Sequence, residues 1–221
     1  MSKFVPSSDC REVIVQTGSL ALCAFLGMPK EAQGVVIFAH GSGSGRMSPR
    51  NNHVAARLRE AGLATLLLDL LTPVEELDRR NVFDIGLLAA RLRFAVDWIA
   101  ANRETAHLRP AYFGASTGGG AAIRAAAGDR RIFAIVSRGG RPDLAGYQAL
   151  SRTTAPTLLI VGGLDGQVID LNRAAAEAMN CRHELAIVPG AGHLFEEAGT
   201  LDQVVELACS WFLRHLQDDA R

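Results

Sequence analysis

Ser116 is the residue of this sequence whose setting best suits a nucleophile. It stands at the centre of a Gly-x-Ser-x-Gly pattern over residues 114–118. A short apolar segment, 111–113, comes before the pattern and an Ala-rich segment follows it, so the serine lies where a strand is expected to turn into a helix. Such a turn needs small neighbours and holds the serine hydroxyl above the sheet. The pattern alone is equally compatible with a glycine-rich turn, and its context favours a nucleophile.

A serine hydroxyl needs a general base, because it is a weak nucleophile at neutral pH. Of the six histidines, His193 lies in a Gly-rich loop directly after the last expected strand, which ends near Val188. That position puts it at the carboxyl edge of the sheet, where Ser116 is also expected. The other histidines precede strands, lie in expected helices or, in one case, open another Gly-rich loop: His40, His53, His107, His183 and His215.

Asp165 is the acid that we expect to orient His193. It follows the apolar segment 157–161, again just beyond the end of a strand. Its alternative role is to cap the next helix, and the competing acid, Asp170, falls inside that helix. The order along the chain is Ser116, then Asp165 49 residues later, then His193 a further 28 residues on. Nucleophile, acid and base occur in this order in α/β-hydrolases, which predicts a Ser-His-Asp triad.

Two backbone N–H groups should stabilise the oxyanion that forms when the serine attacks a carbonyl. We assign one to Thr117, the residue after the nucleophile, and the other to Ser42 in the loop 40–45, His-Gly-Ser-Gly-Ser-Gly. The same loop allows a different reading as a dinucleotide-binding turn. Against it, Arg46 stands where a third glycine is required, and Asp69 lies 26 residues after Gly43, farther than the usual spacing of about 20.

The elements that must position these residues alternate between strands and helices. Residues 13–15 and 20–22 flank a Thr-Gly turn and predict an opening β-hairpin. Apolar segments at 35–39, 64–68, 111–113, 132–136, 157–161 and 185–188 predict six further strands. Helices are expected from Ser48 and Pro49 to Gly62, around 88–99, from the elbow to 127, over 168–179 and after Val204. This pattern predicts an α/β fold with a mostly parallel sheet of about eight strands flanked by helices.

Length and composition are consistent with one α/β domain over residues 1–221. Hydrophobic residues make up 48% and charged residues 21%, which excludes a disordered chain. The 23 basic and 23 acidic residues balance, so no basic excess suggests nucleic-acid binding. No apolar stretch is long enough for a membrane helix, and the N-terminal residues do not resemble a signal peptide. The four cysteines lack metal-ligand spacing, so we expect no zinc site and idle thiols in a reducing cytoplasm.

The chain resembles the α/β-hydrolase superfamily, and within it the dienelactone hydrolase-like family. The residues that carry this resemblance are His40-Gly41, the Ser116 elbow, Asp165 and His193, together with the segments 39–46 and 137–143. The resemblance implies a small cytoplasmic enzyme acting on esters, thioesters or lactones without a metal or a cofactor. The members that give the family its name carry a cysteine in the elbow, whereas this chain has Ser116, which favours a general carboxylesterase.

We therefore expect hydrolysis of small soluble esters, with thioester or lactone hydrolysis as the alternative and a non-catalytic or dinucleotide-binding protein as a distant one. Only about 20 residues separate the strands ending at 136 and starting at 157, so no lid domain is expected there. The segment 71–80 could still cover the mouth of the site. Four arginines near strand ends are candidates for binding a substrate carboxylate: Arg46, Arg50, Arg138 and Arg141. The sequence leaves the oligomeric state open, a homo-oligomer included.

Overall fold

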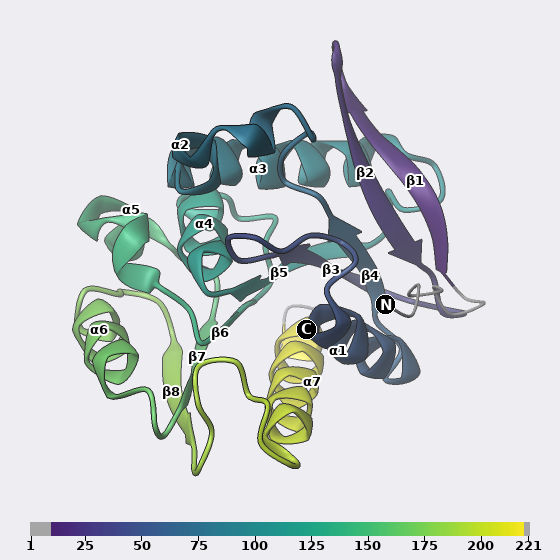
Figure 1. The fold of residues 1–221 in the computed structure, drawn as a ribbon. Helices are drawn as coiled ribbons and strands as arrows, with labels where there is room; N and C mark the ends of the chain where they lie inside the picture. Colours follow the sequence, from purple (N-terminus) through teal and green to yellow (C-terminus); the bar gives the residue numbers. More distant parts are fainter. Residues whose placement is uncertain (1–9, 219–221) are drawn as a thin grey trace.

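The computed structural model describes residues 10–218, and the N-terminal residues on which the signal-peptide expectation rests lie outside them. Its centre is an eight-stranded sheet in the order β1-β2-β4-β3-β5-β6-β7-β8 (Figure 1). The predicted α/β fold with a mostly parallel sheet is confirmed. Within the described part, no helix is both long and apolar enough to span a bilayer.

The sheet opens with the predicted hairpin. Strands β1 (Cys10–Thr17) and β2 (Leu20–Gly27) pair antiparallel, with Thr17 opposite Leu20 across a turn in which Gly18 has φ +57°. A positive φ is accessible to glycine without steric cost, which explains the residue at this tip. Strand β2 then pairs antiparallel with β4 (Ala64–Leu68), and every later pairing in the sheet is parallel.

The parallel part holds the site because the carboxyl ends of its strands share one edge. The strands are β3 (Gly34–Ala39), β4, β5 (Arg109–Ala115), β6 (Ile135–Arg138), β7 (Thr157–Gly162) and β8 (His183–Val188). All residues of β3, β4, β6 and β7 are buried. Burial on both faces is what their continuous apolar sequence predicts.

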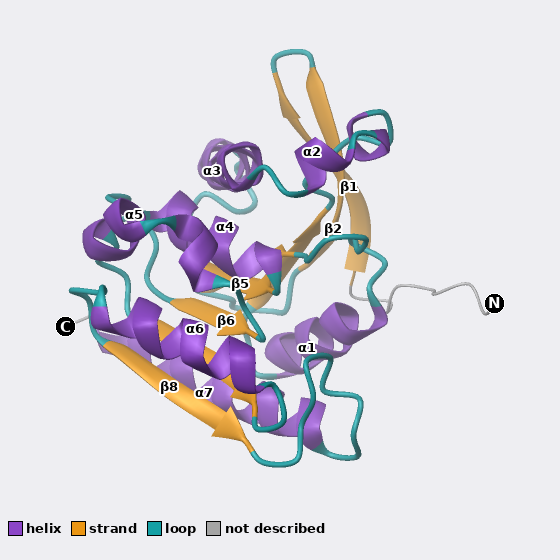
Figure 2. Ribbon diagram, turned by 60° about the vertical axis from the view of Figure 1, so that its left-hand side comes forward, coloured by secondary structure: helices purple, strands orange, loops and turns teal. Residues whose placement is uncertain are grey.

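Helices cover both faces of the sheet (Figures 1 and 2). On one face lie α3 (Ile85–Ala101), α4 (Thr117–Ala126) and α6 (Gly166–Glu177), which contribute to one apolar cluster. On the other lie α1 (Pro49–Glu60) and α7 (Thr200–Asp218), which pack on a second cluster. Ser48 caps α1 and Pro49 is its first residue, both as predicted.

One predicted boundary is wrong. The apolar segment 132–136 predicted a strand, but β6 begins only at Ile135. Ile132 and Phe133 are buried all the same, one in each apolar cluster. Pro156 directly precedes β7, whose first residue pairs with Ile135, and a proline has no N–H to extend the ladder. The segment before Ile135 still bonds to β5, because the N–H of Phe133 donates to the carbonyl of Pro110 at 3.0 Å and that of Tyr112 to the carbonyl of Ala134 at 3.1 Å. Its apolar character therefore reported burial and contact with one neighbouring strand, while the pairing with β7 starts at Ile135.

The chain between β6 and β7 forms no inserted lid domain, in agreement with the predicted fold. It holds a 3-10 turn (Pro142–Ala145) and the short helix α5 (Tyr147–Arg152). The segment between β4 and α3 contains another 3-10 turn (Glu75–Leu77) and α2 (Arg79–Val82).

Candidate active site

Ser116 occupies a sharp turn between β5 and α4. Its backbone has φ +51° and ψ −122°, a conformation that non-glycine residues rarely adopt and that costs free energy. It stands at the N-cap position of α4, yet its side chain makes no capping hydrogen bond. The flanking glycines are required sterically. A Cβ atom on Gly114 would lie 2.5 Å from the carbonyl oxygen of Gly118, and one on Gly118 would lie 2.1 Å from that of Ala39.

Asp165 and His193 meet beyond the ends of β7 and β8. His193 Nδ1 lies 2.6 Å from Asp165 Oδ2. Asp165 occupies the N-cap position of α6, but its side chain does not cap the helix. The competing residue, Asp170, lies within α6 and pairs with Arg173 on the surface. Between the two acids, the structure brings Asp165 to the histidine.

The end of β6 connects this pair to Ser116. The backbone N–H of Ser116 donates to the carbonyl of Arg138 at 3.2 Å, so the elbow lies beside the last residue of β6. The next residue, Gly139, borders His193, because a Cβ atom on it would lie 3.7 Å from His193 Cε1. Ser116 and the His193–Asp165 pair thus lie on either side of the end of β6.

The loop after β3 packs directly on the elbow. A Cβ atom on Gly41 would lie 3.0 Å from the Cβ of Ser116. The N–H of Ser42, one predicted oxyanion donor, donates to Thr117 Oγ1 at 3.1 Å. Thr117 is the residue whose N–H is the second predicted donor. Its side-chain hydroxyl therefore already accepts the N–H of Ser42, the first predicted donor. Sequence patterns gave no sign of this contact, because it depends on where a side chain turns after the fold forms.

Two buried contacts hold the same loop in place. His40 Nε2 accepts a hydrogen bond from the N–H of Leu70 at 3.1 Å, so the ring proton lies on Nδ1, which is 3.0 Å from the carbonyl of Gly41. Asp69 accepts from the backbone N–H of Arg46 at 2.6 Å and pairs with its guanidinium. Asp69 is the acid that a dinucleotide site would need for the ribose, and here it anchors the loop instead.

The loop that bears His193 is also braced. Glu197 accepts a hydrogen bond from the N–H of Gly192 at 3.1 Å, and this bond lowers the pKa of the Glu197 carboxyl. Glu197 and the structural role of His40 were not predicted from the sequence. Neither follows from a local pattern, since each depends on a loop returning to meet it.

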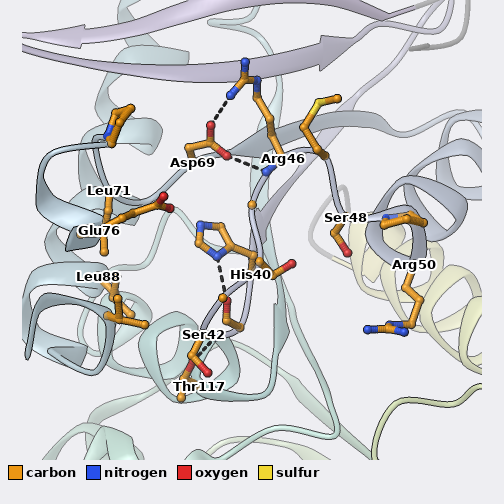
Figure 3. Close-up of a pocket in the computed structure, with 18 residues that line it drawn as sticks. His40, Ser42, Arg46, Ser48, Arg50, Asp69, Leu71, Glu76, Leu88 and Thr117 are labelled. Atoms are coloured by element: carbon orange, nitrogen blue, oxygen red, sulfur yellow. Dashed lines mark hydrogen bonds and ion pairs between the residues drawn. The ribbon is translucent and has the colours of Figure 1, made fainter. Parts of the chain in front are cut away.

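A pocket of about 690 Å³ opens beside the elbow (Figure 3). Its walls are the loop 40–46, the start of α1, the side chain of Thr117 and the segment between β4 and α3, which contributes Leu71, Pro73 and Glu76. The segment 71–80 thus borders the mouth, as the sequence suggested it could. The volume lies in the range of small-ligand sites.

The four candidate arginines differ in their partners. Arg46 pairs with Asp69 and Glu12, and Arg141 forms two hydrogen bonds to Asp143 at 2.8 and 2.7 Å. Arg50 lines the pocket and pairs with Glu196 at 2.9 Å. Arg138 is buried and has no carboxylate partner in the described chain.

Among residues 10–218, no group of three or more His, Cys, Asp or Glu side chains is arranged to hold a metal ion. The four cysteines are free thiols. The side chains predicted for catalysis offer a hydroxyl, an imidazole and a carboxylate.

No protein-family model matches the chain. Two curated proteins of Mycobacterium tuberculosis strains, both provisionally named phosphoribosyl transferase, are 55% identical over 206 residues. That alignment covers 93% of this chain but only 46% of each relative, so the chain spans about half their length.

Among solved structures, Est1E from Butyrivibrio proteoclasticus is 17% identical, with a TM-score of 0.79 over 93% of this chain and 99% of its own, and shares the fold. The dienelactone hydrolase from Anabaena variabilis is 54% identical, with a TM-score of 0.89, and the match covers 93% of this chain and 98% of that one. With that identity over nearly the full length of both proteins, the chain belongs to the dienelactone hydrolase family of α/β-hydrolases.

Proposed function

We propose that this protein is a serine-dependent hydrolase that cleaves small esters by transferring their acyl group to water. The observation that carries the proposal is the 2.6 Å contact between His193 Nδ1 and Asp165 Oδ2, at the same sheet edge as the strained Ser116 elbow. A helix-capping aspartate would accept hydrogen bonds from the first N–H groups of the helix, and the side chain of Asp165 accepts none of them. Membership of a hydrolase family supports the same conclusion.

In this mechanism Ser116 Oγ attacks the ester carbonyl while His193 takes its proton. Asp165 keeps the imidazole in the tautomer with the proton on Nδ1 and stabilises its charged form. His193 then gives the proton to the leaving alcohol, which leaves an acyl group on Ser116. Water, activated by the same histidine, cleaves the acyl-enzyme by the reverse route.

The backbone N–H groups of Thr117 and Ser42 are the proposed oxyanion donors. The N–H of Thr117 belongs to the first turn of α4, where the helix dipole also favours a negative charge. The N–H of Ser42 donates to Thr117 Oγ1, so an incoming oxyanion must take the place of that hydroxyl oxygen.

The pocket favours small substrates. It measures about 690 Å³, and no lid domain closes it among the described residues. Thioesters and lactones follow the same chemistry and remain the alternative substrates.

The test is hydrolysis of p-nitrophenyl esters from acetate to octanoate by the wild type and Ser116→Ala. Loss of a triad nucleophile lowers kcat by at least about 10³-fold, and we expect that loss on every ester that the wild type cleaves. Matched thioester and lactone substrates, assayed in parallel, rank the substrate classes.

Ser151→Ala is the control, because Ser151 lies in α5 and its hydroxyl bonds only to the carbonyl of Gln148. It should retain wild-type rates. If Ser116→Ala keeps the activity of the wild type, or a fluorophosphonate labels both proteins equally, Ser116 is not the nucleophile and the proposal is wrong.

A further inference from the structure

Arg138 is a buried cation without an anionic partner among residues 10–218. It ends β6, and only 7% of its surface is exposed. Nε and Nη1 have no hydrogen-bond acceptor within the described chain, and Nη2 has one distant contact, at 3.4 Å from Asn51 Oδ1. The ring of Phe195 lies 5.9 Å from the guanidinium carbon. Buried arginines are normally paired, because desolvation of an unpaired charge costs several kcal/mol.

The surroundings of Arg138 add to the positive charge. Burial, and then the nearby Arg50, lower the pKa of Arg138 to about 10, so it remains charged at neutral pH. Arg50 and Asn51 lie in the first turn of α1, which contains no acidic residue. The positive end of the helix dipole therefore faces the same region. The carboxylate that reaches this cluster, Glu196, pairs with Arg50 at the surface.

The other candidate arginines are already neutralised. Arg46 is held by Asp69 and Glu12, and Arg141 by both oxygens of Asp143. Their charges are compensated within the protein, so neither gains much from binding a further anion. Within the part of the chain that the structure describes, Arg138 lacks such a partner.

The backbone of Arg138 lies beside the proposed nucleophile, and its side chain reaches Asn51 at the start of α1, next to the pocket-lining Arg50. Its carbonyl accepts the N–H of Ser116, and Arg50 lines the pocket that Thr117 borders. The loop over it carries His193 and Phe195, and Phe195 has φ +54°, a costly conformation for a non-glycine residue. The Arg50–Glu196 pair is exposed, 36% and 65% for the two side chains, so it is weak and replaceable.

We propose that Arg138, with Arg50 and the N-terminus of α1, binds an anionic oxygen group of the substrate, a carboxylate or a phosphate, beside the acyl group that Ser116 attacks. This inference rests on the proposed hydrolase function and narrows its substrates to anionic esters. The bound anion would supply the charge that Arg138 lacks and would displace Glu196 from Arg50. Arginine suits this role because its planar fork bonds two oxygens at once.

The kinetic test compares p-nitrophenyl butyrate with mono-p-nitrophenyl succinate, which is similar in length but carries a carboxylate. In Arg138→Met we expect kcat/KM for the succinate ester to fall at least about tenfold, as for a lost charge-assisted hydrogen bond, with the butyrate rate within about twofold. Arg141→Met is the matched control, because Arg141 is three residues away in loop 139–141 and is paired with both oxygens of Asp143. It should preserve the preference between the two esters.

A second variant predicts the opposite sign. Glu196→Gln removes the carboxylate that competes for Arg50, and Glu196 is exposed enough for the change to be tolerated. We expect it to raise kcat/KM for the succinate ester by about two- to fivefold, the size of a weak surface ion pair, without a gain on the butyrate ester.

Binding measurements separate this inference from the hydrolase proposal, since they need no turnover. Calorimetry on Ser116→Ala, with and without Arg138→Met, uses monomethyl succinate and inorganic phosphate as probes. The probe that binds more tightly shows whether the site prefers a carboxylate or a phosphate group on the substrate. The melting temperature of Arg138→Met should equal or exceed that of the wild type, because a desolvated charge is removed.

Equal losses on both esters with a lower melting temperature would show that Arg138 only supports the fold, and would overturn the inference. So would calorimetry in which neither probe binds, or in which both bind as well after Arg138→Met. If Ser116→Ala remains active but the probes bind through Arg138, the hydrolase assignment fails and the anion site stands.

Discussion

At the scale of single residues, the site depends on side chains that serve more than one contact. Thr117 is the clearest case. Its N–H is a proposed oxyanion donor, while its hydroxyl oxygen holds the N–H of Ser42, the other proposed donor, at 3.1 Å. The residue is almost fully buried and borders the pocket. Its hydroxyl thus competes with the substrate for one of the two donors.

We predict that Thr117→Val increases kcat/KM for small esters by about two- to tenfold. The change removes the competing acceptor but preserves the shape of the side chain, and a neutral hydrogen bond is worth about 0.5–1.5 kcal/mol. Steady-state kinetics on p-nitrophenyl butyrate measure the effect. Thr117→Ser, which retains the hydroxyl, should gain less. A fall in kcat/KM for the valine variant would mean that the hydroxyl itself donates to the oxyanion.

At the scale of elements, the approach of α4 to the sheet decides where Ser116 points. Its first turn contains three consecutive glycines, 118–120, although each costs a helix about 1 kcal/mol relative to alanine. Cβ atoms there would meet Ala39 O at 2.1 Å, Ser137 Oγ at 2.5 Å and Arg141 O at 2.6 Å. The loss of helix propensity is the consequence of this close packing, because only glycines allow the start of α4 to contact β3, β6 and the loop after β6.

We predict that Gly118→Ala destabilises the protein by roughly 3 kcal/mol or more, because its Cβ would overlap backbone that cannot give way as a side chain can. Urea unfolding followed by circular dichroism measures the loss. Gly166→Ala, where no atom lies within 4 Å of the new Cβ, is the control and should stay within about 1 kcal/mol of the wild type. Similar small effects for both variants would contradict the argument.

At the scale of the whole molecule, one sheet joins two apolar layers. The cluster under α3, α4 and α6 and the cluster under α1 and α7 share the strands β2 to β7 between them. The charges balance, and the ion pairs lie mostly at the surface, so they add little to stability. If the helices of one layer unfolded, they would expose one face of the same strands that form the core of the other layer.

We predict that the chain unfolds in one cooperative transition, as a single domain of this kind does. Differential scanning calorimetry measures it, and the calorimetric and van't Hoff enthalpies should agree. Two resolved transitions, or a ratio of calorimetric to van't Hoff enthalpy well above one, would show that the chain contains more than one folding unit.

The sequence by itself determined the fold class and the candidates for chemistry. The signals used were local: continuous apolar strands, turn glycines, and the positions of Ser116, Asp165 and His193 after successive strands. Strand burial, backbone conformation and loop position each depend mainly on a short segment of sequence. The one misplaced strand start, predicted at 132, fails for the same reason. A buried segment has the same local signal whether it pairs with one neighbouring strand or with two, and the proline that limits the pairing with β7 lies just before that strand.

Only the tertiary structure decided which partners those residues have. The sequence left Asp165 with a capping alternative and offered four equivalent arginines. The fold turned Asp165 to His193, paired Arg46 and Arg141 with nearby carboxylates and left Arg138 buried without one. It also placed the Thr117 hydroxyl on the N–H of Ser42, 75 residues away in the chain. Pairing of charges and hydrogen bonds is a matter of distance in space, and sequence spacing does not encode it.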